Sequence, residues 1–304
     1  QEQNVMTRAS WAMLLLLASI WGMSFLFGRI AVQEIPPLTL TFLRVSLAAI
    51  AIWIFVAATR RSVNLTKWFM LNIFGLAILN NVIPFTFILY GQKEIGSGLA
   101  SIVNAMTPIW TVIIANFLTQ DEKFTNRKIL GVAVGFIGVA ILMGGDLVSG
   151  LRASALAQFS VLVATISYGF ASVYAKRFKG VDPIIVAAGQ LNASTFLMAI
   201  IVLLSGDAIG LDMPSTIVVW SVIGIAVPCT AFAYVLYFKI LQIAGATNVS
   251  LVTFLVPVSA IFTGIIFLGE KLTLWHLGGM ALIALGLVIL DGRILKRSAR
   301  YQSP

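Results

Sequence analysis

Ten runs of apolar residues follow one another along the chain of 304 residues, with short polar connections between them. Each run has about 20 residues, the length that an α-helix needs to cross the hydrocarbon core of a bilayer. The pattern therefore predicts an all-α integral membrane protein with ten transmembrane helices. The predicted spans are residues 11–30, 38–59, 68–90, 97–118, 129–145, 155–175, 183–204, 216–237, 246–268 and 274–290.

The composition and the placement of charge add an orientation to this picture. Hydrophobic residues make up 60% of the chain and charged residues 10%, which leaves little for a folded domain outside the membrane. With a cytoplasmic amino terminus, 15 of the 20 Lys and Arg residues lie on the cytoplasmic side. The positive-inside rule then places both termini in the cytoplasm. The net charge of +9 therefore reflects topology and contact with anionic lipids, and no nucleic-acid partner is expected.

The chain also repeats itself once, at an offset close to 148 residues. Each half, residues 1–150 and 151–304, has five predicted spans. Because five is odd, the second half must insert with the opposite orientation, and such inverted repeats are typical of secondary transporters. The matched positions are Trp21-Gly22 with Tyr168-Gly169, Arg29 with Lys176, Pro36 with Pro183, Tyr90 with Tyr237, Pro108 with Pro257, Glu122 with Glu270, and Gly131 and Gly138 with Gly279 and Gly286.

The end of the second half, from Phe267-Leu-Gly-Glu270-Lys271 to Gly279 and on through Gly286, resembles the EamA type of the drug/metabolite transporter superfamily. The first-half copy around Glu122 and the segment from Pro36 to Arg44 resemble it too. The resemblance covers nearly the whole chain. It implies a ten-helix exporter of small metabolites in a bacterial inner membrane, similar to exporters of aromatic and other neutral amino acids.

Polar and aromatic residues near the middle of the spans are candidates for a central substrate cavity, because polar groups are costly at that depth unless they are satisfied or functional. Aromatic walls suit an apolar side chain, and amides suit ammonium and carboxylate groups. The alternative is that the amides join helices and that the aromatic residues pack. Asn192 is chosen over Gln190, on the opposite helix face, because it is deeper. The candidates are Trp21, Asn80, Asn81, Asn104, Trp110, Tyr168, Asn192, Thr230 and Tyr234.

Arg44 is a strong charge well inside a predicted span, where it can attract a substrate carboxylate. The competing interpretation is that it extends outward, or pairs with Glu34 or with the carbonyl end of another helix. Four prolines within spans, Pro84, Pro108, Pro228 and Pro257, can act as hinges for gating or form static kinks. The glycines of spans 5 and 10 predict close helix packing.

The chain lacks several residue types at the positions where enzyme, metal or ion-coupling chemistry would need them. A single cysteine and a single histidine exclude an intramolecular disulfide and a multi-histidine metal site, so we expect no metal or cofactor and no enzyme activity. No Asp or Glu falls within a predicted span, which favours facilitated diffusion over coupling at Glu122 or Glu270. A multidrug exporter of the same fold and a membrane receptor or scaffold remain alternatives. The residues do not distinguish a monomer from a homodimer.

Overall fold

The computed structural model describes residues 7–63, 66–120, 123–148, 150, 152–244, 249 and 251–291, and in this part of the chain it is helical without strands. Eight of the described helical segments are long and apolar enough to span a membrane, and two more apolar helices are somewhat shorter. The elements are α1 (Arg8–Ala31), α2 (Pro37–Ala58), α3 (Lys67–Ala77), η1 (Ile78–Val82), α4 (Ile83–Gln92), α5 (Ser97–Asn104), α6 (Thr107–Leu118), α7 (Asn126–Val148), α8 (Arg152–Tyr174), η2 (Ala175–Phe178), α9 (Pro183–Ser205), α10 (Thr216–Ala226), η3 (Val227–Phe232), α11 (Ala233–Ala244), α13 (Val252–Leu268) and α14 (Leu274–Asp291).

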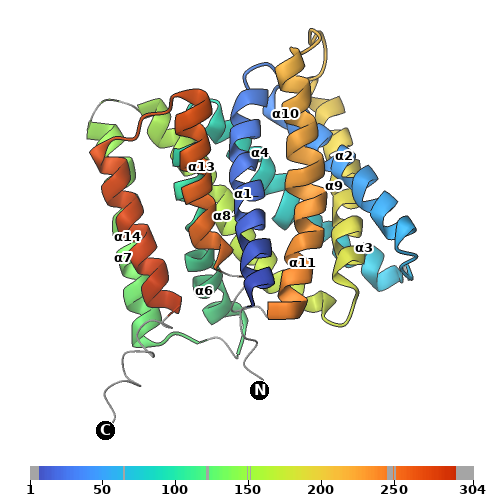
Figure 1. The fold of residues 1–304 in the computed structure, drawn as a ribbon, viewed down its shortest axis with the longest axis horizontal. Coiled ribbons are helices and arrows are strands. Elements are labelled where there is room, and N and C mark those ends of the chain that lie inside the picture. Colours follow the sequence, from blue (N-terminus) through green and yellow to red (C-terminus); the bar gives the residue numbers. More distant parts are fainter. Residues whose placement is uncertain are drawn as a thin grey trace.

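The helices form one bundle in which α1 begins and α14 ends at the same end (Figure 1). We call this end, which also carries the connection from η2 to α9, the terminal end of the bundle. Large apolar side chains such as Ile54, Trp220 and Phe262 lie on the outside with about two thirds of their surface exposed. Such a surface suits contact with lipid, because a soluble protein would bury it. The fold confirms the prediction of ten membrane helices.

Local sequence signals explain where the helices begin and end. The Thr7 and Thr66 hydroxyls accept hydrogen bonds from the first turns of α1 and α3, as N-cap residues do. Asp182 caps α9 in the same way and also forms an ion pair with Arg61 across the two halves of the chain. Gly269 ends α13 with a positive φ of 63°, a conformation that favours glycine.

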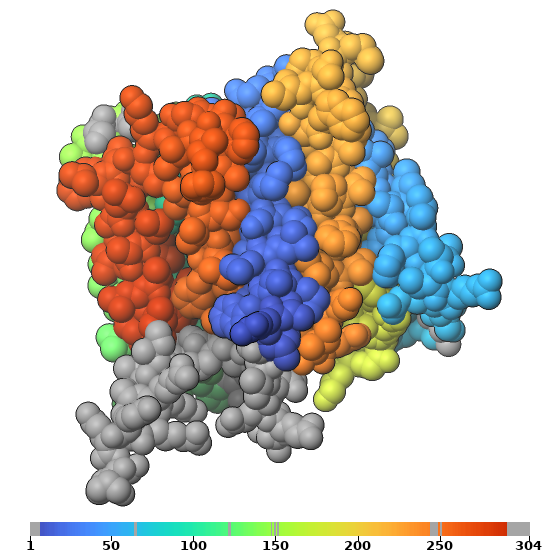
Figure 2. Space-filling view, in the orientation of Figure 1, coloured from blue at the N-terminus to red at the C-terminus, as the bar shows by residue number. Residues whose placement is uncertain are grey.

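Two matching close contacts are made between the halves of the chain. In α1, a Cβ atom at Gly22 would lie 2.4 Å from Ser259 Oγ in α13. In α8, a Cβ atom at the repeat partner Gly169 would lie 2.8 Å from Ile114 Cδ1 and 3.1 Å from Trp110, both in α6. Figure 2 shows α1 closely packed between α13 and the pair α10 and α11. These matched contacts put the described helices of the two halves in corresponding places, as expected for repeats.

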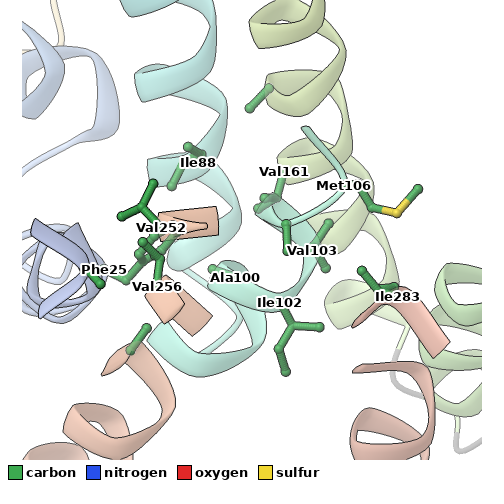
Figure 3. Packing of buried hydrophobic residues seen from close by; sticks show 14 of the residues in the cluster. Phe25, Ile88, Ala100, Ile102, Val103, Met106, Val161, Val252, Val256 and Ile283 are labelled. Atoms are coloured by element: carbon green, nitrogen blue, oxygen red, sulfur yellow. The ribbon is translucent and has the colours of Figure 1, made fainter. Parts of the chain in front are cut away.

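An apolar core joins α1, α4, α5, α8, α13 and α14. Figure 3 shows Phe25 of α1 beside Val252 and Val256 of α13, with Ile88 and Ala100 nearby. Burying an aromatic or branched side chain of this kind contributes about 1.5–3 kcal/mol in an aqueous setting. In a bilayer the gain comes from close packing instead, because lipid tails are as apolar as the core. Shape complementarity at these contacts therefore holds the bundle together.

Helices α7 and α14 lie against each other at one edge of the bundle (Figure 1). A Cβ atom on Gly138 would lie 2.8 Å from the Gly279 backbone oxygen, and one on Gly131 would lie equally close to that of Gly286. The predicted small-residue packing of spans 5 and 10 is thus present between the two spans. Because backbone meets backbone there, neither helix can yield by turning a side chain.

We expect Gly279→Ala to destabilise the protein by roughly 1–3 kcal/mol, since the new methyl group would overlap Gly138 and Leu142. Its neighbour provides a matched control, because a Cβ atom at Gly278 would meet nothing within 4 Å. Thermal unfolding in the same detergent measures both variants. Equal melting temperatures for Gly279→Ala and Gly278→Ala would contradict the packing described here.

Candidate functional site

A cavity of about 990 Å³ lies at the centre of the bundle and is lined by helices from both halves of the chain. At the terminal end it reaches the exposed residues Lys176, Lys179 and Gly180 near the connection from η2 to α9. At the other end its wall consists of buried side chains, among them Phe25, Gln92 and Ser101. The cavity is therefore accessible from the terminal end and closed at the opposite end.

Arg44 lies in the cavity wall and is 7% exposed. Its Nε donates to Thr230 Oγ1 at 3.0 Å, and its guanidinium carbon lies 3.6 Å from the centre of the Phe85 ring. Thr230 donates its own hydroxyl proton to the Ile225 carbonyl, so its oxygen is oriented to accept from Arg44. These contacts fix a cation beside the cavity.

The alternative partner considered for Arg44, Glu34, is bonded elsewhere. Its carboxylate accepts from the Ser215 hydroxyl at 2.7 Å and from the Ser215 backbone N–H at 2.6 Å. These two hydrogen bonds lower the pKa of Glu34, because they favour its charged form. Within the described residues no carboxylate pairs with Arg44, and no Asp, Glu or His lines the cavity. The interpretation of Arg44 as an outward-extending residue or a partner of Glu34 is therefore wrong.

A chain of amide and hydroxyl groups joins the two halves beside Arg44. Asn80 Nδ2 donates to Gln190 Oε1 at 3.0 Å and lies 3.4 Å from the Tyr234 hydroxyl. Tyr234 donates to Asn81 Oδ1 at 3.1 Å, and Asn81 Nδ2 donates to Ser194 Oγ at 3.0 Å. Asn80, Gln190 and Tyr234 face the cavity, whereas Asn81 is fully buried behind its wall. The network holds the cavity-facing amides in defined orientations.

Two π-helical segments present polar groups from this wall. η1 carries Asn80 and Asn81, and η3, at the matching place in the second half, carries Thr230. A π-helical turn holds an extra residue, and such turns are common at functional sites. Pro84 follows η1 at the start of α4, and Pro228 lies within η3. Each half therefore has one widened turn, and a proline predicted as a hinge or kink lies within that turn or directly after it.

The structure brings most of the predicted residues together in the cavity wall. Among the polar and aromatic candidates, Asn81, Trp110 and Asn192 lie outside the wall, and Trp110 instead packs against Phe136 with ring centroids 5.2 Å apart. Pro108 lies at the start of α6. Like Pro84 and Pro228, it does not line the cavity. The predicted residues that line the cavity are Trp21, Arg44, Asn80, Asn104, Tyr168, Thr230, Tyr234 and Pro257.

The choice of Asn192 over Gln190 is corrected by the structure. Asn192 is exposed on the outside of the bundle, beside Trp53 and Ile54 of α2, whereas Gln190 is 4% exposed and lines the cavity. Two residues along a helix are about 200° apart, so only one of the pair can face inward. Depth in the bilayer does not reveal which face turns to the centre.

Sequence reasoning also missed several residues of the cavity wall. Tyr237 lies 5.7 Å from Trp21, measured between ring centroids, and its place in the repeat opposite Tyr90 was the available signal. Phe25 and Phe85 carried no signal, because the chain has 20 phenylalanines. The remaining missed residues with polar or charged side chains include Ser24, Gln92, Ser101, Thr107, Ser172, Lys176, Lys179, Cys229 and Thr253.

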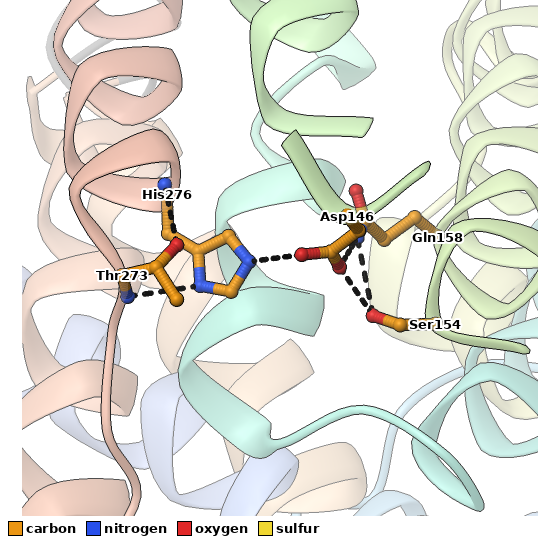
Figure 4. A network of polar contacts seen from close by, with 5 residues as sticks. All are labelled: Asp146, Ser154, Gln158, Thr273 and His276. Atoms are coloured by element: carbon orange, nitrogen blue, oxygen red, sulfur yellow. Dashed lines mark hydrogen bonds and ion pairs between the residues drawn. The ribbon is translucent and has the colours of Figure 1, made fainter. Parts of the chain in front are cut away.

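The expectation that no acidic residue lies within a span is also wrong. α7 continues to Val148, so Asp146 belongs to the helix and is 2% exposed. Its carboxylate contacts His276 Nε2 at 3.1 Å and accepts from Gln158 Nε2 at 2.6 Å and from the Ser154 hydroxyl (Figure 4). The predicted span ended at Gly145 because hydropathy falls there. Asp146 joins α7, α8 and α14 and does not line the cavity.

A second interaction of His276 determines which of its ring nitrogens carries the proton. Its Nδ1 accepts from the Thr273 backbone N–H at 3.3 Å, while the Thr273 hydroxyl accepts from the His276 backbone N–H (Figure 4). This is a capping box at the start of α14, with histidine in the usual place of glutamate. Because Nδ1 accepts, Nε2 carries the proton that points to Asp146.

Glu270 forms a further link between the halves at the closed end of the cavity. Its carboxylate oxygens accept from the backbone N–H groups of Ser97 and Gly98 at 2.6 and 2.9 Å. A carboxylate at a helix N-terminus is stabilised by the helix dipole, here that of α5. Glycines surround it closely, since a Cβ atom at Gly96 or Gly264 would overlap the carboxylate. Its repeat partner, Glu122, lies outside the described residues.

Comparisons with known proteins agree with this architecture. The profile of the EamA-like transporter family matches residues 9–144 and again residues 155–290. The chain belongs to the EamA-like transporter family, and the resemblance noted in the sequence is confirmed.

Relatives of similar length carry transporter names. The "Uncharacterized transporter YoaV" of Bacillus subtilis is 27% identical over 88% of this chain and 91% of that protein. A "Probable amino-acid metabolite efflux pump" of Salmonella typhimurium is 28% identical over 97% of this chain and 99% of its own. A solved crystal structure aligns with a TM-score of 0.64 at 19% identity, covering 96% of this chain and 99% of that one, which supports the fold.

We expect Asp146→Asn to lower the free energy of unfolding by roughly 1–3 kcal/mol, because the amide would turn its donor hydrogens either toward Ser154 and Gln158 or toward His276 Nε2, all of which already donate. Chemical or thermal unfolding in detergent measures the loss. Asp212→Asn is the control, since Asp212 is exposed. If both variants unfold like the wild type, the network of Figure 4 does not stabilise the protein.

Proposed function

We propose that this chain exports small metabolites, principally aromatic and other neutral amino acids, by alternating access through the central cavity. The observation that carries the proposal is the composition of the cavity wall. It combines aromatic side chains with one buried cation, Arg44, and its described residues include no carboxylate. Such a wall suits a molecule that has a carboxylate at one end and an apolar group at the other.

Each part of an amino acid has a complementary group in this wall. The guanidinium of Arg44 can bind the carboxylate through charge-assisted hydrogen bonds. Asn104 Oδ1 is buried without a hydrogen-bond partner among the described residues, so it can accept from an ammonium group. Trp21 and Tyr237 form an aromatic surface for the side chain. A lipophilic cation would find no acidic partner here, which disfavours the multidrug alternative.

The proposed direction, export, is supported by the placement of positive charge and by the names of relatives. We place the terminal end, which carries most of the Lys and Arg residues, in the cytoplasm of a bacterial inner membrane. The cavity is accessible from that end, and with this orientation substrate would enter it from inside the cell. In the opposite state, residues 1–150 and 151–304 exchange their packing roles, with the four span prolines as hinges. The names of the efflux-pump relatives support the same direction.

The direct test is uptake of labelled phenylalanine, tryptophan and threonine by proteoliposomes that contain the full chain and are preloaded with the same unlabelled amino acid. We expect exchange that does not depend on an imposed pH gradient, because no Asp, Glu or His is among the described residues of the wall. Protein-free liposomes are the control. No exchange of any of the three amino acids would contradict the proposal.

The neighbouring amides of α9 provide a matched pair of variants. We expect Gln190→Ala to reduce exchange by about tenfold, since it removes the hydrogen-bond partner of Asn80 and a polar group of the wall. Asn192→Ala should exchange like the wild type, because Asn192 lies outside the cavity. Both variants are compared at equal amounts of reconstituted protein. The reverse ranking would place the substrate on the other face of α9.

A further inference from the structure

The charge of Arg44 is only partly satisfied by the protein. A guanidinium has five N–H donors and stays charged at any physiological pH. In this structure Nε donates to Thr230, and one face of the group lies on the Phe85 ring. Among the described residues Arg44 has no other hydrogen-bond partner and no carboxylate partner. Its remaining N–H groups are therefore left to whatever occupies the cavity.

Solvent reaches the cavity from the terminal end, so water can hydrate Arg44 when no substrate is bound. To open at the other side, an alternating-access carrier must first close over the cavity, which removes most of this water. A desolvated, unpaired cation inside a membrane protein is strongly unfavourable. The empty carrier therefore meets a high barrier at the step in which it changes orientation.

A bound carboxylate removes this barrier. It accepts hydrogen bonds from the free N–H groups and neutralises the guanidinium, so the loaded cavity closes over a paired charge. Lys176 and Lys179 are exposed at the mouth of the cavity, whereas the barrier described here concerns the buried guanidinium of Arg44. Their positive charge attracts anions toward the cavity instead.

We propose that the protein works as an exchanger of carboxylates, in which Arg44 makes reorientation depend on a bound carboxylate. The inference rests on the proposed function, since it concerns the same cavity and the same carboxylate. It goes further in two respects. The recognised group is the carboxylate rather than the whole amino acid, and net transport is slow unless a second carboxylate returns with the carrier.

The test compares two batches of proteoliposomes that contain the full chain. One batch holds unlabelled phenylalanine inside and the other only potassium sulfate buffer, and both receive labelled phenylalanine outside. We expect initial uptake into the loaded batch to be faster by about tenfold or more, because only loaded carriers return quickly. Equal uptake by the two batches would overturn the exchange proposal while leaving the transport function intact. No uptake by either batch would overturn both.

Two internal probes identify the group that is recognised. N-acetylphenylalanine keeps the carboxylate and lacks the ammonium charge, whereas phenylalaninamide keeps the ammonium and lacks the carboxylate. We expect N-acetylphenylalanine to accelerate uptake and phenylalaninamide to leave it at the rate of the sulfate batch. The opposite result would refute the role of the carboxylate. Acceleration by internal chloride, equal to that by phenylalanine, would refute it as well.

Variants of Arg44 link the effect to its charge. Arg44→Gln should bind substrate more weakly and, because its empty cavity has no charge to desolvate, should show loaded and empty uptake rates within about twofold of each other. Arg44→Lys keeps the charge and should keep the large difference between the two rates. If Arg44→Gln retains the difference, another group imposes exchange. The wild-type comparison stands on its own, so it decides the proposal even when a variant does not fold.

Discussion

A helix inside a bilayer must satisfy its own backbone hydrogen bonds, and this constraint governs how the protein builds a polar cavity. A cavity lined with loops would leave backbone groups unpaired at the centre of the membrane. The chain instead widens two helices by a π-helical segment each, η1 and η3, at matching places in its two halves. Thr230 in η3 bonds to the Ile225 carbonyl and to Arg44, so the widened turn supplies the support for the buried cation.

The two halves meet through backbone packing where α7 lies against α14, and through side-chain hydrogen bonds around the cavity. Backbone packing at Gly138 and Gly279 joins α7 to α14 away from the cavity, and Asp146 with His276 adds a polar link to the same pair. Around the cavity, the halves meet through side-chain hydrogen bonds such as that between Asn80 and Gln190. Side-chain bonds can be exchanged during a conformational change more readily than interlocked backbones. We therefore regard α7 and α14 as the static part of the protein.

Hydropathy and the repeat were sufficient to predict the ten helices, because both depend on residue types averaged over about 20 positions. The errors arose where a single position mattered. Asp146 was excluded from its span because the apolar run ends at Gly145, although the helix continues. Asn192 was preferred to Gln190 because depth can be counted along the chain, whereas the face that turns inward depends on packing against α2 and α3. The sequence did not reveal that Trp110 packs outside the cavity wall or that Phe85 lines the cavity, since packing partners decide which aromatic residues reach it.

The two halves of the bundle repeat each other, but the buried charge of Arg44 occurs in only one of them. At the offset of 147 that pairs Pro36 with Pro183, Arg44 matches Leu191, so the cation of the first half has an apolar counterpart in the second. Similarly, Tyr237 lines the cavity while its counterpart Tyr90 is exposed on the outside. A pocket with exact twofold symmetry would accept a ligand in two equivalent poses. This one distinguishes head from tail, so under the proposed function a polar molecule would keep a single orientation relative to the protein while access changed from one membrane side to the other.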